Sequence, residues 1–156
     1  MAFFVTKNMT TRLELKNGNG LRTSELETRK GFLEGQHILT IDQFDRAMLE
    51  QVCELASHMK VSAERKLILS PLERMAICCI FFEPSSRTME SFGVAANKLG
   101  AFTRNLVGER DGKTGEWVIP YSSMIKGETF EDTIATLSTF YDAIVIRHPV
   151  IGKVAI

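Results

Sequence analysis

The feature that most constrains the fold is a continuous apolar run from Met75 to Phe82 (MAICCIFF), followed directly by Glu83-Pro84-Ser85-Ser86. An unbroken apolar run of this length is typical of a parallel strand that is covered on both faces. The proline and the serines then end the run. The sequence therefore predicts a buried strand of the kind found in α/β proteins.

Apolar periods on either side of this strand predict further helices and strands. Helices are predicted over 40–60, over 86–99 and over 129–141, and strands over 101–107 and 144–146. Thr40 and Gln43 have the spacing of a capping box for the first helix, and Gly100 suits the residue that follows the second. The order α, β, α, β, α, β predicts an α/β fold with a parallel sheet and helices on both faces.

The chain has 156 residues, which is close to the size of one domain. Residues 1–33 show no sustained apolar period, so we expect a flexible N-terminal extension followed by one domain over 34–156. The connection from Gly108 to Glu128 contains four glycines and is longer than an idle loop usually is. This length is typical of a functional loop, with a surface excursion that has no role as the alternative.

Composition excludes two classes of partner. Lys plus Arg number 19 and Asp plus Glu number 19, so the basic charge expected of a nucleic-acid-binding protein is missing. No apolar run approaches the ~18 residues that a membrane span needs. Cys53, Cys78 and Cys79 offer neither a disulfide framework nor a C-x-x-C metal site, so we expect small buried hydrophobic residues. The N-terminal residues do not have the pattern of a secretory or transit peptide, and we expect a cytoplasmic protein.

The segment F-F-E-P-S-S-R-T, residues 81–88, carries the strongest chemical signal. Free N–H groups and the helix dipole favour an anion at the start of the predicted second helix. Hydroxyl groups and a guanidinium fork that matches a phosphate are supplied by Ser85, Ser86, Arg87 and Thr88. The Walker and G-x-G-x-x-G patterns are absent, so we expect a phosphate or phosphonate held without a metal. The alternative is a helix cap with a surface arginine.

Two further clusters lie at the ends of predicted elements. Ser122 to Thr129 (SSMIKGET) precedes the third helix, and Arg147-His148-Pro149 follows the third strand. Ligands of open parallel sheets bind beyond the carboxyl ends of the strands, so Arg87, Arg147 and the Lys126 loop can converge on one anion. The alternatives are a solvated loop lysine at Lys126 and, for His148, a structural hydrogen-bonding residue rather than a base.

The motifs F-F-E-P-S-S-R-T, K-G-E-T-F-E-D-T and D-A-I-V-I-R-H-P, in this order, resemble the N-terminal half of the aspartate carbamoyltransferases. The resemblance covers residues 34–150. The ornithine carbamoyltransferases share the S-x-R-T signature, but the K-G-E-T and R-H-P segments are more similar to the aspartate enzymes. The resemblance therefore implies carbamoyl transfer from carbamoyl phosphate to L-aspartate in pyrimidine synthesis, without a cofactor.

The resemblance also implies roles for particular residues. Ser85, Ser86, Arg87 and Thr88 would form the carbamoyl phosphate loop, and Arg147 would touch the same ligand. Ser122 and Lys126 would enter the active site of the neighbouring subunit, so the catalytic residues would be Arg87, Thr88, Arg147 and Lys126. Such a shared site implies a homotrimer, in some members with regulatory chains or with other pyrimidine enzymes in one chain.

The sequence departs from the family in two ways. Met89 stands where many members have an arginine, and Ser86 replaces the commoner threonine. The family's H-P-x-Q segment and its aspartate-binding domain are missing, so we expect a truncated carbamoyl phosphate domain that is inactive alone. The other hypotheses are a non-catalytic carbamoyl phosphate-binding or assembly module, an ornithine carbamoyltransferase-like enzyme, and a structural remnant with exposed sheet edges.

Overall fold

The computed structural model describes residues 5–6, 35–83, 85–120 and 122–150. The helical elements are η2 (Ile41–Gln43), α1 (Arg46–Glu64), α2 (Ser86–Lys98), η3 (Ser123–Lys126) and α3 (Phe130–Phe140). The strands are β1 (Val5–Thr6), β2 (Ala76–Phe81), β3 (Phe102–Val107), β4 (Glu109–Arg110), β5 (Trp117–Val118) and β6 (Ala143–Arg147).

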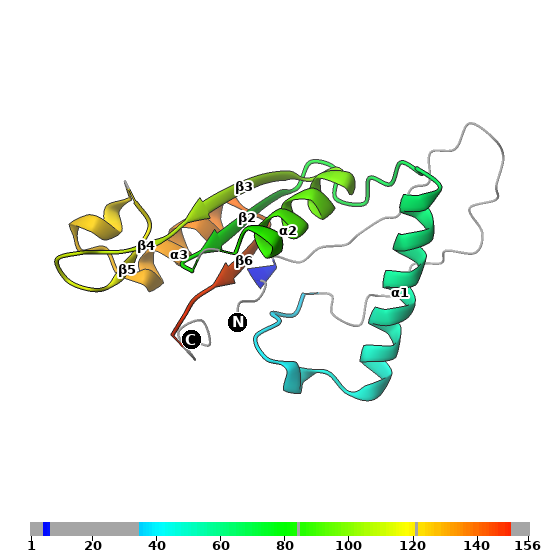
Figure 1. Cartoon of the computed structure of the whole chain (residues 1–156), viewed down its shortest axis with the longest axis horizontal. Helices are drawn as coiled ribbons and strands as arrows, with labels where there is room; N and C mark the ends of the chain where they lie inside the picture. Colours follow the sequence, from blue (N-terminus) through cyan, green and yellow to red (C-terminus); the bar gives the residue numbers. More distant parts are fainter. Residues whose placement is uncertain (1–4, 7–34, 84, 121, 151–156) are drawn as a thin grey trace.

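The main sheet has four strands in the order β1-β6-β2-β3 (Figure 1). β2 pairs in parallel with β3 on one side and with β6 on the other, so that Cys78 lies opposite Arg104 and Ile144. β2 therefore has a parallel neighbour on each side, and its side chains from Ile77 to Phe81 are almost completely buried. The parallel strand predicted from the apolar run is confirmed.

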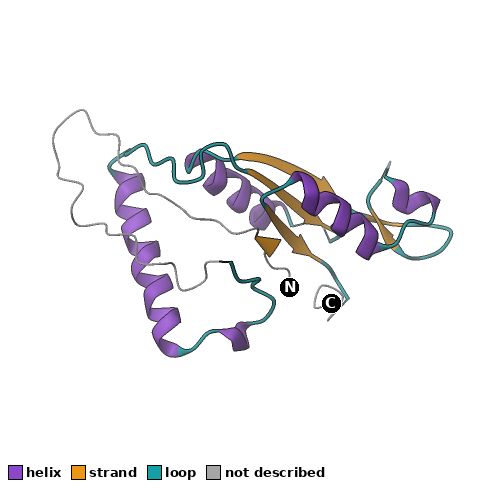
Figure 2. Ribbon diagram, turned by 180° about the vertical axis from the view of Figure 1, so that it is seen from behind, coloured by secondary structure: helices purple, strands orange, loops and turns teal. Residues whose placement is uncertain are grey.

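Helices cover both faces of this sheet, as predicted. Figure 1 shows α2 in front of the strands and α3 behind them, and Figure 2 shows the same layers from the other side. On the α3 face the core contains Cys78, Ile80 and Phe82 with Ile144, Ile146 and Phe130. On the α2 face it contains Ile77, Cys79 and Phe81 with Ala96, Ala143 and Val145. The alternation of side chains along β2 thus builds two apolar layers.

The first predicted helix differs from the prediction at its start. The capping box of Thr40 and Gln43 is present, but it belongs to η2, which is a separate turn. α1 begins after Asp45, whose carboxylate accepts a hydrogen bond of 2.8 Å from the N–H of Met48. No residue of α1 is buried, and both views show the helix standing apart from the sheet. The periodic apolar residues thus form a helix, as predicted, but the apolar face of this helix does not join the core.

The long connection after β3 is structured. β4 and β5 form a two-stranded antiparallel hairpin, and η3 follows it. The carboxylate of Asp111 closes the hairpin by accepting hydrogen bonds from the N–H of Lys113 and the hydroxyl of Thr114, both 2.9 Å long. These hydrogen bonds lower the pKa of Asp111, the one from Lys113 most. The glycine-bearing segment is thus an ordered excursion from the edge of the sheet.

The expected N-terminal extension contains one described element. Val5 and Thr6 form β1, which pairs antiparallel with Ile144 and Ala143 of β6. The other residues of the extension lie outside the described residues, so its flexibility and its boundary at residue 33 stay predictions.

The three cysteines do not share one environment. Cys78 and Cys79 on β2 are completely buried, as expected, whereas Cys53 on α1 is exposed, so the expectation of burial is wrong there. Cys53 faces solvent because α1 does not pack on the sheet. Burial, together with the neighbouring Cys79 thiol, raises the pKa of Cys78 to about 12, and burial also raises the pKa of Cys79.

We expect a maleimide to label the native protein once, at Cys53. The thiolate is the reactive form of cysteine, and the raised pKa values keep Cys78 and Cys79 protonated as well as inaccessible. Mass spectrometry after a brief reaction at neutral pH would measure this, with labelling in urea as the control that reaches all three thiols. Rapid native labelling of Cys78 would contradict the described core.

Candidate functional site

The turn between β2 and α2 leaves the start of the helix open. Ser85 occupies the cap position but makes no hydrogen bond from its side chain to the first turn of α2. Its hydroxyl instead donates to Oγ1 of Thr88 over 3.0 Å, and its carbonyl accepts from the N–H of Met89. The N–H groups of the first turn are thus left without this cap, which suits binding of an anion.

The other described α-helices begin differently. The side chain of Asp45 caps α1, and the hydroxyl of Thr129 caps α3 by accepting from the N–H of Asp132. At α2, by contrast, Ser86 and Arg87 are exposed and Thr88 is half-buried. The hydroxyl and guanidinium groups predicted to bind an anion therefore surround a helix start that is accessible to solvent.

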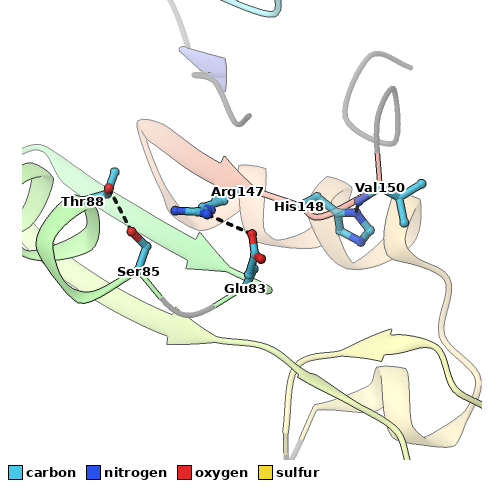
Figure 3. Close-up of polar contacts among 6 residues, drawn as sticks. All are labelled: Glu83, Ser85, Thr88, Arg147, His148 and Val150. Atoms are coloured by element: carbon cyan, nitrogen blue, oxygen red, sulfur yellow. Dashed lines mark hydrogen bonds and ion pairs between the residues drawn. The ribbon is translucent and has the colours of Figure 1, made fainter.

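Arg147 lies at the end of the neighbouring strand. The register places it opposite Phe81, and its carbonyl accepts a hydrogen bond of 2.9 Å from the N–H of Phe82. One guanidinium nitrogen, Nη2, is 2.9 Å from Oε2 of Glu83, and the two side chains remain 33% and 50% exposed (Figure 3). The structure thus brings Arg147 and the turn before α2 to adjacent strand ends, as predicted.

Glu83 is not among the site residues that the sequence predicts, where it only ends the apolar run. Its ion pair with Arg147 nevertheless holds the guanidinium beside the turn. The available signal was a carboxylate at one parallel strand end and an arginine at another. Neither side chain is buried, so the ion pair contributes little to stability and acts mainly by orienting the guanidinium of Arg147.

Ser122 and Lys126 are not brought to this place. Ser122 caps η3, donating to the carbonyl of Ile119 over 2.6 Å and accepting from the N–H of Met124. Met124 is buried in the core of the α3 face, and Lys126 is exposed. Figures 1 and 2 both show η3 at the end of the molecule beside the hairpin, away from the start of α2. Lys126 and Arg87 of one chain therefore do not converge.

His148 is a structural residue, as the alternative for it stated. It is only 7% exposed, and its Nδ1 accepts a hydrogen bond of 3.1 Å from the N–H of Val150. Its ring packs against Phe82 and Phe130, with centroid distances of 4.9 and 5.6 Å. A proton acceptor already engaged in this way is not available as a general base.

The described part of the chain offers no cluster of His, Cys, Asp and Glu side chains that could hold a metal ion. Among the same residues, no helix has the length and apolar character needed to cross a bilayer. The chemistry at the start of α2 consists of cationic groups, hydroxyl groups and backbone amides. This set of donors suits an oxyanion such as a phosphate.

The model of one protein family matches residues 36–155. It is described as the carbamoyl-P binding domain of aspartate/ornithine carbamoyltransferase. The chain belongs to the aspartate/ornithine carbamoyltransferase family. The matched range begins before η2 and includes every predicted site residue.

Curated relatives agree with this assignment. The aspartate carbamoyltransferase catalytic subunit of Saccharophagus degradans is 39% identical over 121 residues, which are 78% of this chain and 33% of that protein. The multifunctional protein pyrABCN of Emericella nidulans is 37% identical over 114 residues, which are 73% of this chain and 4% of that protein. The chain thus spans a third or less of the length of these two relatives.

Solved structures of the family share the fold. The aspartate transcarbamoylase of Trypanosoma cruzi, in complex with carbamoyl aspartate and phosphate, superposes with a TM-score of 0.63 at 35% identity, covering 74% of this chain and 34% of that chain. The catalytic subunit of the M. jannaschii enzyme gives a TM-score of 0.60 at 30% identity, with the same coverage of both chains. The α/β architecture is therefore that of part of an aspartate transcarbamoylase.

Proposed function

We propose that this chain is the carbamoyl phosphate half of an aspartate carbamoyltransferase. The observation that carries the proposal is the start of α2, which lacks a side-chain cap and lies beside Arg147. In this proposal Ser85, Ser86, Arg87 and Thr88 bind carbamoyl phosphate together with Arg147. The ligands named for the Trypanosoma cruzi structures, carbamoyl phosphate and phosphate, have the chemistry that this donor set suits.

The reaction proposed is transfer of a carbamoyl group to the amine of L-aspartate. The amine nitrogen bonds to the carbonyl carbon, the bond from this carbon to the bridging oxygen breaks, and phosphate leaves while the amine loses a proton. Arg87 holds the phosphate, and Arg147 together with Thr88 stabilises charge that develops on the carbonyl oxygen. Because Thr88 accepts its hydrogen bond from Ser85, its own hydroxyl proton is free to point to the ligand.

L-Aspartate as the second substrate is supported by the relatives. The Saccharophagus degradans and Cellvibrio japonicus proteins are both aspartate carbamoyltransferase catalytic subunits, and one Trypanosoma cruzi structure is a complex with carbamoyl phosphate and aspartate. We assign the binding of L-aspartate to the part of such enzymes that lies outside the matched third. The K-G-E-T segment of this chain favours the same choice over ornithine.

We also propose a homotrimer in which Ser122 and Lys126 complete the site of the neighbouring subunit. The support is the position of η3, which presents an exposed Lys126 away from the Arg87 of its own chain. Regulatory chains, or a multifunctional chain like that of Emericella nidulans, are compatible with this assembly. The free thiols of Cys78 and Cys79 favour the reducing cytoplasm as the compartment.

Calorimetry with phosphonoacetamide, a stable analogue in which a methylene group replaces the bridging oxygen of carbamoyl phosphate, tests the anion site. Replacing Arg87 by alanine is expected to weaken binding roughly 10- to 100-fold, because it removes charge-assisted hydrogen bonds worth about 1.5–3 kcal/mol. Arg46→Ala is the matched control, since Arg46 also lies at a helix start but is 93% exposed and forms an ion pair with Glu50. Equal affinity of the wild type and Arg87→Ala would refute the assignment.

A further inference from the structure

Three aromatic rings form a closed triangle at the carboxyl end of the sheet. The ring centroids of Phe82 and Phe130 are 5.6 Å apart, those of Phe82 and His148 are 4.9 Å apart, and those of Phe130 and His148 are 5.6 Å apart. The interplanar angles of 56° to 69° are those of the tilted and edge-to-face arrangements that aromatic pairs prefer. All three residues are buried. We call this group the ring triad.

Each ring belongs to a segment that carries proposed site residues. Phe82 immediately precedes Glu83 and the turn into α2, and His148 immediately follows Arg147. Phe130 is the first residue of α3 and directly follows the loop that carries Lys126. The ring triad is therefore the point at which these three segments contact one another through side chains.

Two neighbouring backbone groups also restrain the ring triad. Gly108, at the end of β3, lies directly under Phe82: a Cβ at this position would come within 2.5 Å of Cδ1 of the ring. The hydrogen bond from the N–H of Val150 to Nδ1 fixes the plane of the His148 ring. The rings thus have little freedom to move relative to the strand ends.

The side chains of Arg147 and His148 point to opposite faces at the end of β6. In an extended chain, successive side chains point to opposite faces, and Figure 3 shows Arg147 directed toward Glu83 while His148 points away from it. The orientation of one side chain therefore fixes that of the other. A shift of His148 within the ring triad would displace Arg147 from the turn before α2.

We propose that the ring triad of Phe82, Phe130 and His148 is the positioning unit of the anion site, holding the α2 turn and Arg147 in register and anchoring the base of the Lys126 loop. The proposal rests on the proposed function. The three rings are positioning residues, because they lie in the core and act through Glu83, Arg147 and the Lys126 loop. A misplacement of about 1 Å in such a site can lower catalysis on the order of 100-fold.

Two substitutions of His148 separate the ring from its hydrogen bond. His148→Phe keeps an aromatic ring and loses the acceptor for the N–H of Val150, a residue that is itself 53% exposed. His148→Asn keeps an acceptor and loses the ring. We expect phosphonoacetamide to bind His148→Phe within about threefold of the wild type and His148→Asn at least tenfold more weakly. Phe130→Leu, which also removes a ring, should behave like His148→Asn.

Leu137→Ala is the matched control for lost stability. Leu137 packs on the same core from α3, two turns beyond Phe130, and carries none of the proposed site residues on its own turn. It should lower the melting temperature and leave the affinity unchanged, with all titrations made well below every melting temperature. An affinity of His148→Asn equal to that of the wild type, or equal weakening by Leu137→Ala, would overturn the proposal.

A second measurement separates this proposal from the function itself. The guanidinium NMR signal of Arg147, whose Nη2 is 2.9 Å from Oε2 of Glu83, reports this ion pair without any ligand. We expect this signal to move in His148→Asn and Phe130→Leu but not in Leu137→Ala. If the wild type does not bind phosphonoacetamide, the proposed function fails, whereas an unmoved Arg147 signal in both ring variants refutes the ring triad alone.

Discussion

Replacing Gly108 by alanine is expected to lower the free energy of unfolding by the upper part of the range of about 1–3 kcal/mol that overpacking costs. The added Cβ would meet both the ring and the backbone of Phe82, at 2.5 Å from Cδ1 and 2.9 Å from Cα. Phe82 is fully buried, and the N–H of Gly108 donates to the carbonyl of Phe81. The backbone at Gly108 therefore cannot move away from the Phe82 ring. Urea denaturation followed by circular dichroism measures the loss as a lower midpoint.

Gly112→Ala provides the matched control for this substitution. Gly112 lies in the hairpin, and a Cβ there would meet nothing within 4 Å. The same change of residue should therefore be neutral or stabilise the protein by about 0.4–1 kcal/mol, through the lower entropy of the unfolded chain. Equal midpoints for the two variants would mean that β3 does not end against Phe82 as described.

Mixing two inactive variants should restore activity in an enzyme that carries this domain at the full length of its relatives. If Arg87 and Lys126 act in the same chain, chains with Arg87→Ala and chains with Lys126→Ala remain inactive in any mixture. If the site lies between subunits of a cyclic trimer, random mixing places an intact Arg87 beside an intact Lys126 in about a quarter of the sites. We expect the second result, because η3 stands away from α2.

The rate of carbamoyl aspartate formation after joint refolding of the two variants measures this restoration. Each parent, unfolded and refolded alone at the same total concentration, is the control. A mixture that is no faster than its parents would place Lys126 in its own chain's site or outside any site. It would leave the anion-binding assignment of Arg87 untouched, since calorimetry tests that separately.

The sheet and its two covering helices could be predicted because local sequence patterns determine where these elements begin and end. The apolar run before Pro84, the period of α3 and the glycine after α2 each depend on neighbouring residues alone. The start of α1 was not predictable in the same way. Two competing caps, Thr40 and Asp45, lie five residues apart, and the first closes only the short turn of η2. Cys53 is exposed because α1 lies away from the sheet. The apolar period of the helix does not specify where the helix packs.

The site was predictable in part for a related reason. The turn into α2 is local, and its hydroxyl and guanidinium groups were recognised from their order in the chain. The ion pair between Glu83 and Arg147 depends on the register of two strands that are distant in sequence, so no local pattern specifies it. The separation of Lys126 from Arg87 depends on the path of the β4–β5 hairpin, which the number of glycines does not indicate.

The pairing of β2 on both sides also sets an order for folding. Cys78 contacts Arg104 after 26 intervening peptide steps but meets Ile144 only after 66. Closing the longer segment costs about 0.8 kcal/mol more chain entropy, so the β2-α2-β3 unit is expected to assemble first. The turn before α2, which would bind a phosphate, is then formed in the nascent chain before β6 pairs with β2. Arg147 on β6 reaches the site last, so the turn and the arginine take their places at different times during synthesis.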